Sequence, residues 1–167
     1  EESPSHPLFA NELKFGILKP ISQEKLQNLR KRFTQCGILP GVALNLAYFV
    51  SWVIIHGTKY CKKAVIATGV SGNPLLPVFG QIKNIIVFKN LIYFELWSIA
   101  TYCFDLKYQS YHISTNYQTY FYYPYDRLLD FNVFHIRKTS ANESYISTKY
   151  YIDDLMETHA DDENPLF

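Results

Sequence analysis

VFGQIKNIIVFKNLIYFELWSIATYCF, residues 78–104, is the stretch of sequence that determines the fold of this chain. VFGQIKNIIVF and LIYFELWSIATYCF each indicate a strand, because β-branched and aromatic residues favour extended chain over helix. Lys89 and Asn90 predict a short turn, so the two strands should pair as neighbours. Gly80, inside the first strand, indicates a bulge or a tight bend.

Further strands are predicted on both sides of this pair. On the N-terminal side, AYFVSWVIIH and KYCKKAVIAT form a hairpin around His56-Gly57-Thr58, and GVSGNPLLP is a loop. On the C-terminal side, the predicted strands are YQSYHIST, NVFHIRK and SYISTKYY. Between them, YQTYFYYPYDR (residues 117–127) is interpreted as a strand-to-strand connection that is aromatic on both faces.

ISQEKLQNLRKRFTQCG, residues 21–37, predicts the main helix of the chain. Ser22 is suited to the N-cap and Gly37 to the C′ position. Leu26, Leu29 and Phe33 recur at helical spacing and make one apolar stripe. A short C-terminal helix is expected to begin near residue 152, with acidic residues in its first turns.

These segments predict a mostly β fold. Short strands in adjacent hairpins imply an antiparallel sheet, and a sheet of this size hides its edges most easily by curling. We therefore expect a small antiparallel barrel or strongly curled sheet, with one N-terminal helix and a short C-terminal helix. We expect residues 1–20 to be an extended arm, 21–157 a single β-rich domain, and 158–167 a frayed acidic tail.

Composition and charge restrict the class of protein. The chain has 167 residues with 48% hydrophobic content, which is not a disordered composition. Residues 1–90 carry eleven Lys/Arg against four Glu, a net +7, and residues 91–167 carry five against eleven Asp/Glu, a net −6. No apolar run is long enough for a membrane span, and Glu1 and Glu2 stand where a secretory signal would be basic. We expect an intracellular protein without a membrane partner, with the nucleus as a candidate location.

Residues 50–115 resemble a known but uncharacterised family. The first phrase that carries the resemblance is Pro77, Phe79, Gly80 and Ile82, and the second is Phe104, Tyr108 and Tyr111. This pattern is similar to the C-terminal β domain of transposon-derived proteins found in fish, insect and cnidarian genomes, and ISTKYYIDDL adds to the similarity. The resemblance implies no established activity, and it transfers no catalytic residue to this chain.

Basic residues suggest a contact with DNA or RNA. Lysine and arginine that converge on one face neutralise phosphates and release counterions. The candidates lie in the predicted helix, in the predicted hairpin and in the strand after it: Arg30, Lys31, Arg32, Lys59, Lys62, Lys63 and Lys83.

Two other hypotheses belong to different classes. Exposed tyrosines make good protein interfaces, so Tyr120, Tyr122, Tyr123 and Tyr125 are candidates for a protein-interaction or self-association surface. A hydrolase could use Cys61 or Cys103 as nucleophile with His112 as base. The three cysteines form no short-spaced pair, so we expect no metal and no cofactor.

The first expectation is a non-catalytic binding module of a mobile-element-derived protein, which contacts nucleic acid through the basic hairpin. A protein-interaction domain and a Cys/His hydrolase are the alternatives.

Overall fold

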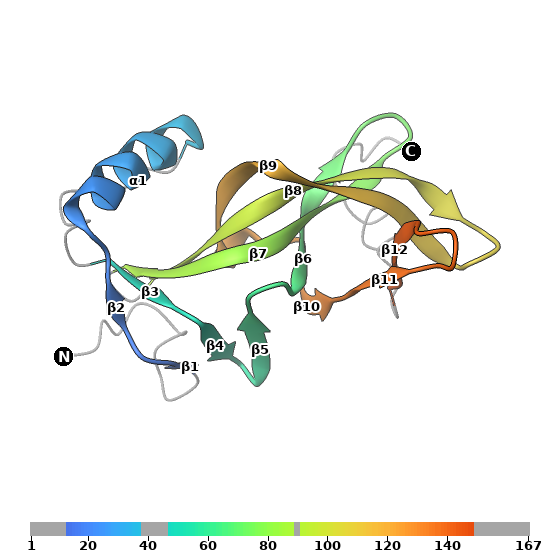
Figure 1. Ribbon diagram of the computed structural model, residues 1–167. Coiled ribbons are helices and arrows are strands. Elements are labelled where there is room, and N and C mark those ends of the chain that lie inside the picture. Colours follow the sequence, from blue (N-terminus) through green and yellow to red (C-terminus); the bar gives the residue numbers. More distant parts are fainter. Residues whose placement is uncertain (1–12, 38–46, 89–90, 149–167) are drawn as a thin grey trace, which may run out of the picture.

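The computed structural model describes residues 13–37, 47–88 and 91–148, and strands dominate this part of the chain (Figure 1). The first elements are β1 (Leu13–Phe15), β2 (Lys19–Pro20), α1 (Gln23–Gln35), β3 (Tyr48–Val50), β4 (Trp52–Ile55) and β5 (Thr58–Cys61). The others are β6 (Val65–Ser71), β7 (Leu76–Phe88), β8 (Leu91–Asp105), β9 (Ser110–Pro124), the 3₁₀ helix η3 (Tyr125–Arg127), β10 (Asp130–Phe134), β11 (Ile136–Lys138) and β12 (Ser144–Ile146). The prediction of a mostly β, antiparallel fold with an N-terminal helix is confirmed.

The long strands β7, β8 and β9 form the centre of the molecule and span its width in Figure 1. β7 pairs antiparallel with β8, and β8 pairs antiparallel with β9. One edge of β7 is shared, because β6 pairs with its first half and β3 with its second half. The predicted turn at residues 89–90 lies outside the described residues.

The main sheet is open, with the strand order β10-β6-β7-β8-β9-β12-β11. β10 ends at Phe134 and β11 begins at Ile136, so one residue of chain connects the two ends of the sheet. These end strands are not hydrogen-bonded to each other. Of the two expected forms, a small barrel or a strongly curled sheet, the closed barrel is therefore wrong for the described residues. The edges are kept short instead, since β10 has five residues and β11 has three, and a short edge exposes few unpaired backbone groups.

A separate three-stranded sheet has the order β1-β4-β5. The predicted hairpin is confirmed, with His56 and Gly57 both at positive φ, as a tight β-hairpin turn requires. The predicted strand KYCKKAVIAT is interrupted at residues 62–64, because Lys63 has a φ of 75° and turns the chain from the small sheet into the main one. The predicted loop GVSGNPLLP is shorter than expected, because β6 continues to Ser71 and β7 starts at Leu76.

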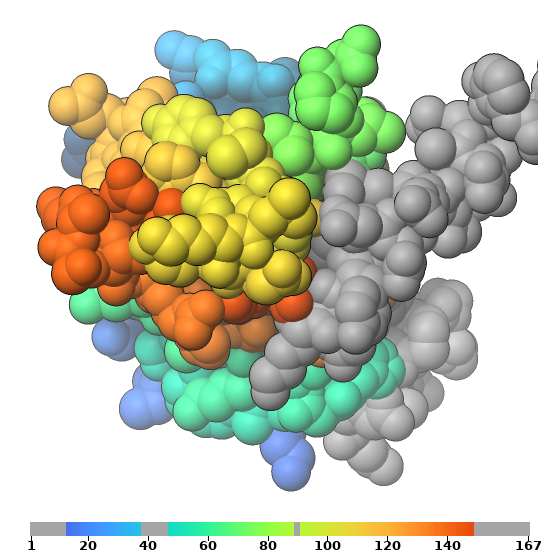
Figure 2. All heavy atoms as spheres, turned by 90° about the vertical axis from the view of Figure 1, so that its right-hand side faces the viewer, coloured from blue at the N-terminus to red at the C-terminus, as the bar shows by residue number. Residues whose placement is uncertain are grey.

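Opposite faces of β7 and β8 are covered by different elements. Ile86 and Tyr93 belong to the apolar cluster that includes Leu26, Leu29 and Phe33 of α1. Their neighbours Ile85 and Phe94 belong to the cluster that includes residues of β4 and β5, such as Val53 and Tyr60. Because successive side chains of a strand point to opposite faces, α1 and the three-stranded sheet pack on opposite sides of the central strands. Figures 1 and 2 both place α1 above these strands and β4 and β5 below them.

The helix has the ends that its sequence predicts. The Ser22 hydroxyl accepts a hydrogen bond from the Lys25 backbone N–H at 3.4 Å, which caps the N-terminus of α1. Gly37 follows the helix at a φ of 74°, the left-handed conformation common at C′.

The remaining expectations concern the ends of the chain. Within the predicted arm of residues 1–20, β1 pairs with β4 and β2 pairs with β3, and residues 1–12 lie outside the described part. The predicted C-terminal helix near residue 152 and the tail of residues 158–167 also lie outside it.

Gly80 tests the close contact between β7 and β8. A Cβ atom added at Gly80 would lie 2.8 Å from the Leu96 Cβ, whereas one added at Gly69 on β6 would meet no atom within 4 Å. We expect Gly80→Ala to lower the free energy of unfolding by about 1–3 kcal/mol, the usual range for overpacking a core. Gly69→Ala is the matched control and should cause no comparable loss. Equilibrium urea unfolding measures both, and equal stability of the two variants would contradict the packing of this strand pair.

Candidate nucleic-acid interface

Four lysines and a tryptophan lie on the outer side of the three-stranded sheet or at its end. Lys14 of β1, Ile54 of β4 and Lys59 of β5 are cross-strand neighbours. Lys62 and Lys63 follow β5 directly, and all four lysines are exposed. We call this surface the lysine face; it consists of Lys14, Trp52, Lys59, Lys62 and Lys63.

Trp52 is the aromatic group of the lysine face. It is half-buried, and the Lys59 Nζ atom lies 5.4 Å from its ring centroid. A Cβ atom at Gly16 would lie 2.9 Å from the indole Nε1, so glycine at this position lets the chain pass close to the ring. The ring is therefore held in place beside Lys59.

Carboxylates are absent from the segments that build the lysine face. Residues 13–20 and 47–64 contain no aspartate or glutamate. Asp130 of β10 comes near the inner side of β5, but it is buried and accepts hydrogen bonds from the backbone and side chain of Asn132. The positive charge of the four lysines is thus not neutralised by acidic residues within these segments.

The seven predicted basic residues do not converge on one face. Lys59, Lys62 and Lys63 belong to the lysine face, whereas Arg30, Lys31 and Arg32 are on α1, which packs on the opposite side of the central strands. Lys83 is on the α1 side as well. Its Nζ lies 2.8 Å from Glu95, and Glu95 also accepts a hydrogen bond from Tyr122, which belongs to the apolar cluster beneath α1.

A groove of about 190 Å³ lies between α1 and strands β7, β8 and β9. We call it the α1 groove. Its lining residues come from five elements: Lys25, Asn28, Leu29, Phe49, Lys83, Asn84, Glu95, Tyr120 and Tyr122. This volume is smaller than the roughly 300–1,000 Å³ of pockets that hold drug-sized ligands, so the groove accommodates a single small group.

Glu95 is the centre of a polar network in the α1 groove and is only 4% exposed. Its Oε1 accepts hydrogen bonds from Lys83 Nζ and Asn84 Nδ2, both at 2.8 Å. Its Oε2 accepts a hydrogen bond from the Tyr122 hydroxyl. Burial, and then this bond to the Glu95 carboxylate, raises the pKa of Tyr122, so the phenol keeps the proton that it donates.

A β-bulge makes this network possible. Adjacent residues of a regular strand point to opposite faces, yet Lys83 and Asn84 both bind one oxygen of Glu95. In the pairing of β7 with β8, Ile82 is opposite Leu96 and Asn84 is opposite Glu95, which leaves Lys83 as the extra residue. A bulge redirects a side chain in this way.

The tyrosine-rich segment continues β9 up to Pro124 and then forms η3, so its interpretation as a connection was wrong. Tyr122 is 5% exposed and packs in the apolar cluster that includes residues of α1. Tyr125 is 6% exposed and packs on the opposite face of the sheet, in the apolar cluster that includes residues of β5. Tyr120 and Tyr123 are half-buried, and the Tyr123 hydroxyl donates to the Thr68 and Arg127 carbonyls. The four predicted tyrosines thus form no single surface, and an interaction role for them stays a prediction.

Three aromatic rings meet on the α1 side of the sheet. Only one of them, Tyr120, was among the candidate residues for a protein-interaction surface. Trp97 lies 5.9 Å from Tyr120 and 5.7 Å from Tyr117, measured between ring centroids. Tyr117 is 59% exposed. We call Tyr117, Trp97 and Tyr120 the aromatic ladder. Sequence gave no signal for it, because the three residues meet only through the pairing of β8 with β9.

The candidate nucleophile Cys103 lies opposite His112 in the pairing of β8 with β9. The centroid of the His112 imidazole lies 5.2 Å from the ring centroid of Tyr102 and 5.0 Å from that of Tyr145. No hydrogen bond joins His112 to Cys103 or Cys61 among the described residues. Catalysis would need a base within hydrogen-bond reach of the thiol, so the hydrolase hypothesis stays a prediction without that bond.

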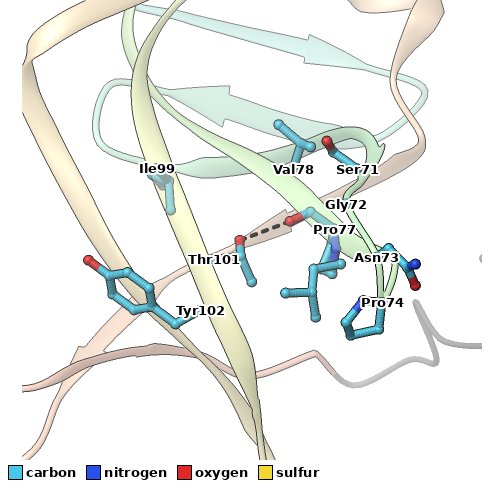
Figure 3. A pocket seen from close by; sticks show the side chains of 10 residues that line it. Ser71, Gly72, Asn73, Pro74, Pro77, Val78, Ile99, Thr101 and Tyr102 are labelled. Carbon is cyan, nitrogen blue, oxygen red and sulfur yellow. Dashed lines mark hydrogen bonds between the residues drawn. The ribbon is translucent and has the colours of Figure 1, made fainter.

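A second, more open hollow of about 420 Å³ lies beside the turn from β6 to β7 (Figure 3). Its wall includes Gly72, Pro74 and Tyr102, and the Thr101 hydroxyl donates to the Pro77 carbonyl at 2.8 Å. Among the described residues that line it, Tyr102 has the only ionisable side chain.

Comparison of the chain with protein-family models, with curated proteins and with solved structures found no match in any of the three. The resemblance to transposon-derived proteins is therefore still a prediction. Within the described ranges, no helix has the length and apolar character needed to cross a bilayer.

The Lys83–Glu95 pair can be tested through stability. Lys83→Met leaves Glu95 without its counter-ion, and we expect a loss of about 2 kcal/mol in the free energy of unfolding. This is less than the roughly 3–5 kcal/mol of a fully buried pair, because the Lys83 side chain is 29% exposed. Lys107→Met, at an exposed lysine in the β8–β9 turn, is the control.

Adding Glu95→Gln to Lys83→Met should recover part of this loss, because the neutral amide needs no counter-ion. Chemical denaturation of the single and double variants measures the coupling. A Lys83→Met variant as stable as Lys107→Met would show that the pair contributes nothing.

Proposed function

We propose that this domain is a non-catalytic binding module of a mobile-element-derived protein, and that it contacts nucleic acid through the lysine face. The single observation that carries the proposal is the charge of that face. Four exposed lysines lie on the strands of one small sheet or directly after its last strand, and no carboxylate occurs in the segments that build it. The mobile-element origin rests on the resemblance of residues 50–115 alone.

The chemistry of the lysine face suits a phosphate backbone. Each lysine that contacts a phosphate releases condensed counterions, so the affinity depends on salt more than on sequence. Lysine is a flexible point charge, and a surface of lysines can follow a backbone without reading bases. Trp52 adds one ring that can lie against a sugar or an unpaired base.

This proposal places the working protein inside the cell, with the nucleus as a candidate location. The three cysteines are free thiols, which suits a reducing compartment.

Charge reversal at the lysine face tests the proposal. We expect the protein to bind mixed-sequence DNA or RNA with an affinity that falls steeply as salt is raised. Lys62→Glu combined with Lys63→Glu should abolish binding at moderate salt. If residual binding can be measured at low salt, the slope of log affinity against log salt should fall by about 2, one for each lost phosphate contact.

The matched control is Lys107→Glu combined with Lys138→Glu, which changes the net charge equally at exposed positions outside the lysine face. Fluorescence anisotropy of labelled oligonucleotides over a salt series measures all three proteins. Equal weakening by both double variants would mean that net charge alone controls binding. That result, or salt-insensitive binding by the unmodified protein, would refute the lysine face as the site.

A further inference from the structure

The α1 groove has the charge and the hydrogen-bond donors for an anionic ligand. Lys25 and Lys83 line it, and Arg32 lies at its edge with its guanidinium 4.3 Å from the Tyr120 ring centroid. Glu95, the single carboxylate among its described lining residues, already accepts hydrogen bonds from three donors. The groove therefore has unneutralised positive charge. The Lys83 ammonium has three protons and makes one hydrogen bond among the described residues, to Glu95 at 2.8 Å.

The helix turns its polar stripe toward the groove. Lys25, Asn28 and Arg32 are spaced three and four residues apart, so they lie along one side of α1. Leu29 and Phe33 anchor that side in the apolar cluster beneath it. The cations of α1 are thus held along the edge of the sheet by a packed interface and not by a flexible loop.

The aromatic ladder leads from the groove toward solvent. In the pairing of β8 with β9, Trp97 is opposite Tyr120 and Ser98 is opposite Asn116, which leaves residues 117–119 without partners. The Asn116 side chain accepts the Gln118 backbone N–H at 2.9 Å and shapes this bulge. The bulge brings Tyr117 beside Trp97 while 59% of Tyr117 remains exposed, so a planar group can reach its ring.

Cations beside exposed rings are the combination that single-stranded nucleic acid requires. A base stacks on an aromatic side chain, and the adjacent phosphate contacts lysine or arginine. A duplex does not offer this arrangement, because its bases are stacked on one another and unavailable. The groove volume of about 190 Å³ also suits one small group and not a duplex.

We propose that the α1 groove and the aromatic ladder bind an unpaired nucleotide of a single strand. Tyr117 and Trp97 stack on the base, and Lys83, Arg32 and Lys25 contact the phosphate. The inference shares its ligand class with the proposed function but uses a different surface, on the opposite side of the central strands. A failure of one can therefore be distinguished from a failure of the other.

The two tryptophans allow each surface to be followed separately, because the chain has only Trp52 and Trp97. In Trp52→Phe protein, the remaining fluorescence reports on the aromatic ladder. We expect quenching by oligothymidylate of about ten nucleotides, a length within the roughly 4–16-nucleotide sites of single-strand-binding folds. A self-complementary duplex of the same length should cause no quenching.

Tyr117→Ala in the Trp52→Phe background should weaken oligothymidylate binding about tenfold, the effect of losing one stacked base. Tyr108→Ala is the matched control, since Tyr108 is an exposed tyrosine at the β8–β9 turn, away from the groove. Both residues are exposed, and circular dichroism verifies that both variants fold. Quenching that Tyr117→Ala weakens and Tyr108→Ala does not would support the proposal.

Three results would overturn the inference: no quenching by the single strand, equal quenching by the duplex, or equal affinity of the Tyr117→Ala and Tyr108→Ala variants. A fourth is loss of the Trp97 response when Lys62→Glu and Lys63→Glu are introduced, because the groove would then not be a separate site. In Trp97→Phe protein, salt-dependent quenching of Trp52 by the duplex reports on the lysine face alone. This Trp52 signal therefore tests the proposed function independently of the α1 groove.

Discussion

Burial of β7 and β8 on both faces is the constraint on which the rest of the structure depends. Side chains alternate along these strands, so Ile86 and Tyr93 need one apolar cover, and Ile85 and Phe94 need another on the other side. The helix α1 supplies the first cover, and β4 and β5 supply the second. These covers, together with Lys62 and Lys63 directly after β5, carry seven of the eleven basic residues of residues 1–90, so these residues are divided between two surfaces. Each surface contains one of the two tryptophans.

Irregularities in the long strands position the polar and aromatic groups of the α1 side. The bulge at Lys83 brings two adjacent residues of β7 onto one carboxylate oxygen of Glu95. The bulge of residues 117–119 places Tyr117 beside Trp97. In a regular strand, Lys83 and Asn84 would point to opposite faces of the sheet, and so would Tyr117 and Tyr120. The α1 groove thus depends on departures from strand regularity, whereas Lys14 and Lys59 of the lysine face lie on a small sheet that pairs without register shifts.

Sequence patterns predicted the helix and the positions of the main strands, because helix caps and apolar periodicity are local signals. Pairing of strands that are adjacent in the chain, β4 with β5 and β7 with β8, was predicted as well. Whether the sheet closes depends on contacts between strands far apart in the chain, and of the two expected forms, a barrel or a strongly curled sheet, no closed barrel is found among the described residues. Lys83 was predicted as a phosphate contact, but its counter-ion is twelve residues away across a bulge. Glu95 is the only charged residue in residues 91–104, and the other thirteen are uncharged. A lone carboxylate in such a strand was a signal of that buried pair. The tyrosine-rich run was correctly seen as aromatic on both faces, and its buried members are covered because both faces of the sheet are covered.

Aromatic nuclear Overhauser contacts in solution test the central claim most directly, namely that α1 and the three-stranded sheet cover opposite faces of β7 and β8. The rings of Tyr93 and Tyr122 each lie 5.0 Å from Phe33 of α1, and Phe94 lies 5.5 Å from Tyr60 of β5. The account predicts contacts from Phe33 to Tyr93 and Tyr122, contacts from Tyr60 to Phe94, and none between Phe33 and Tyr60. A contact between Phe33 and Tyr60 would place the two elements on the same face and contradict it.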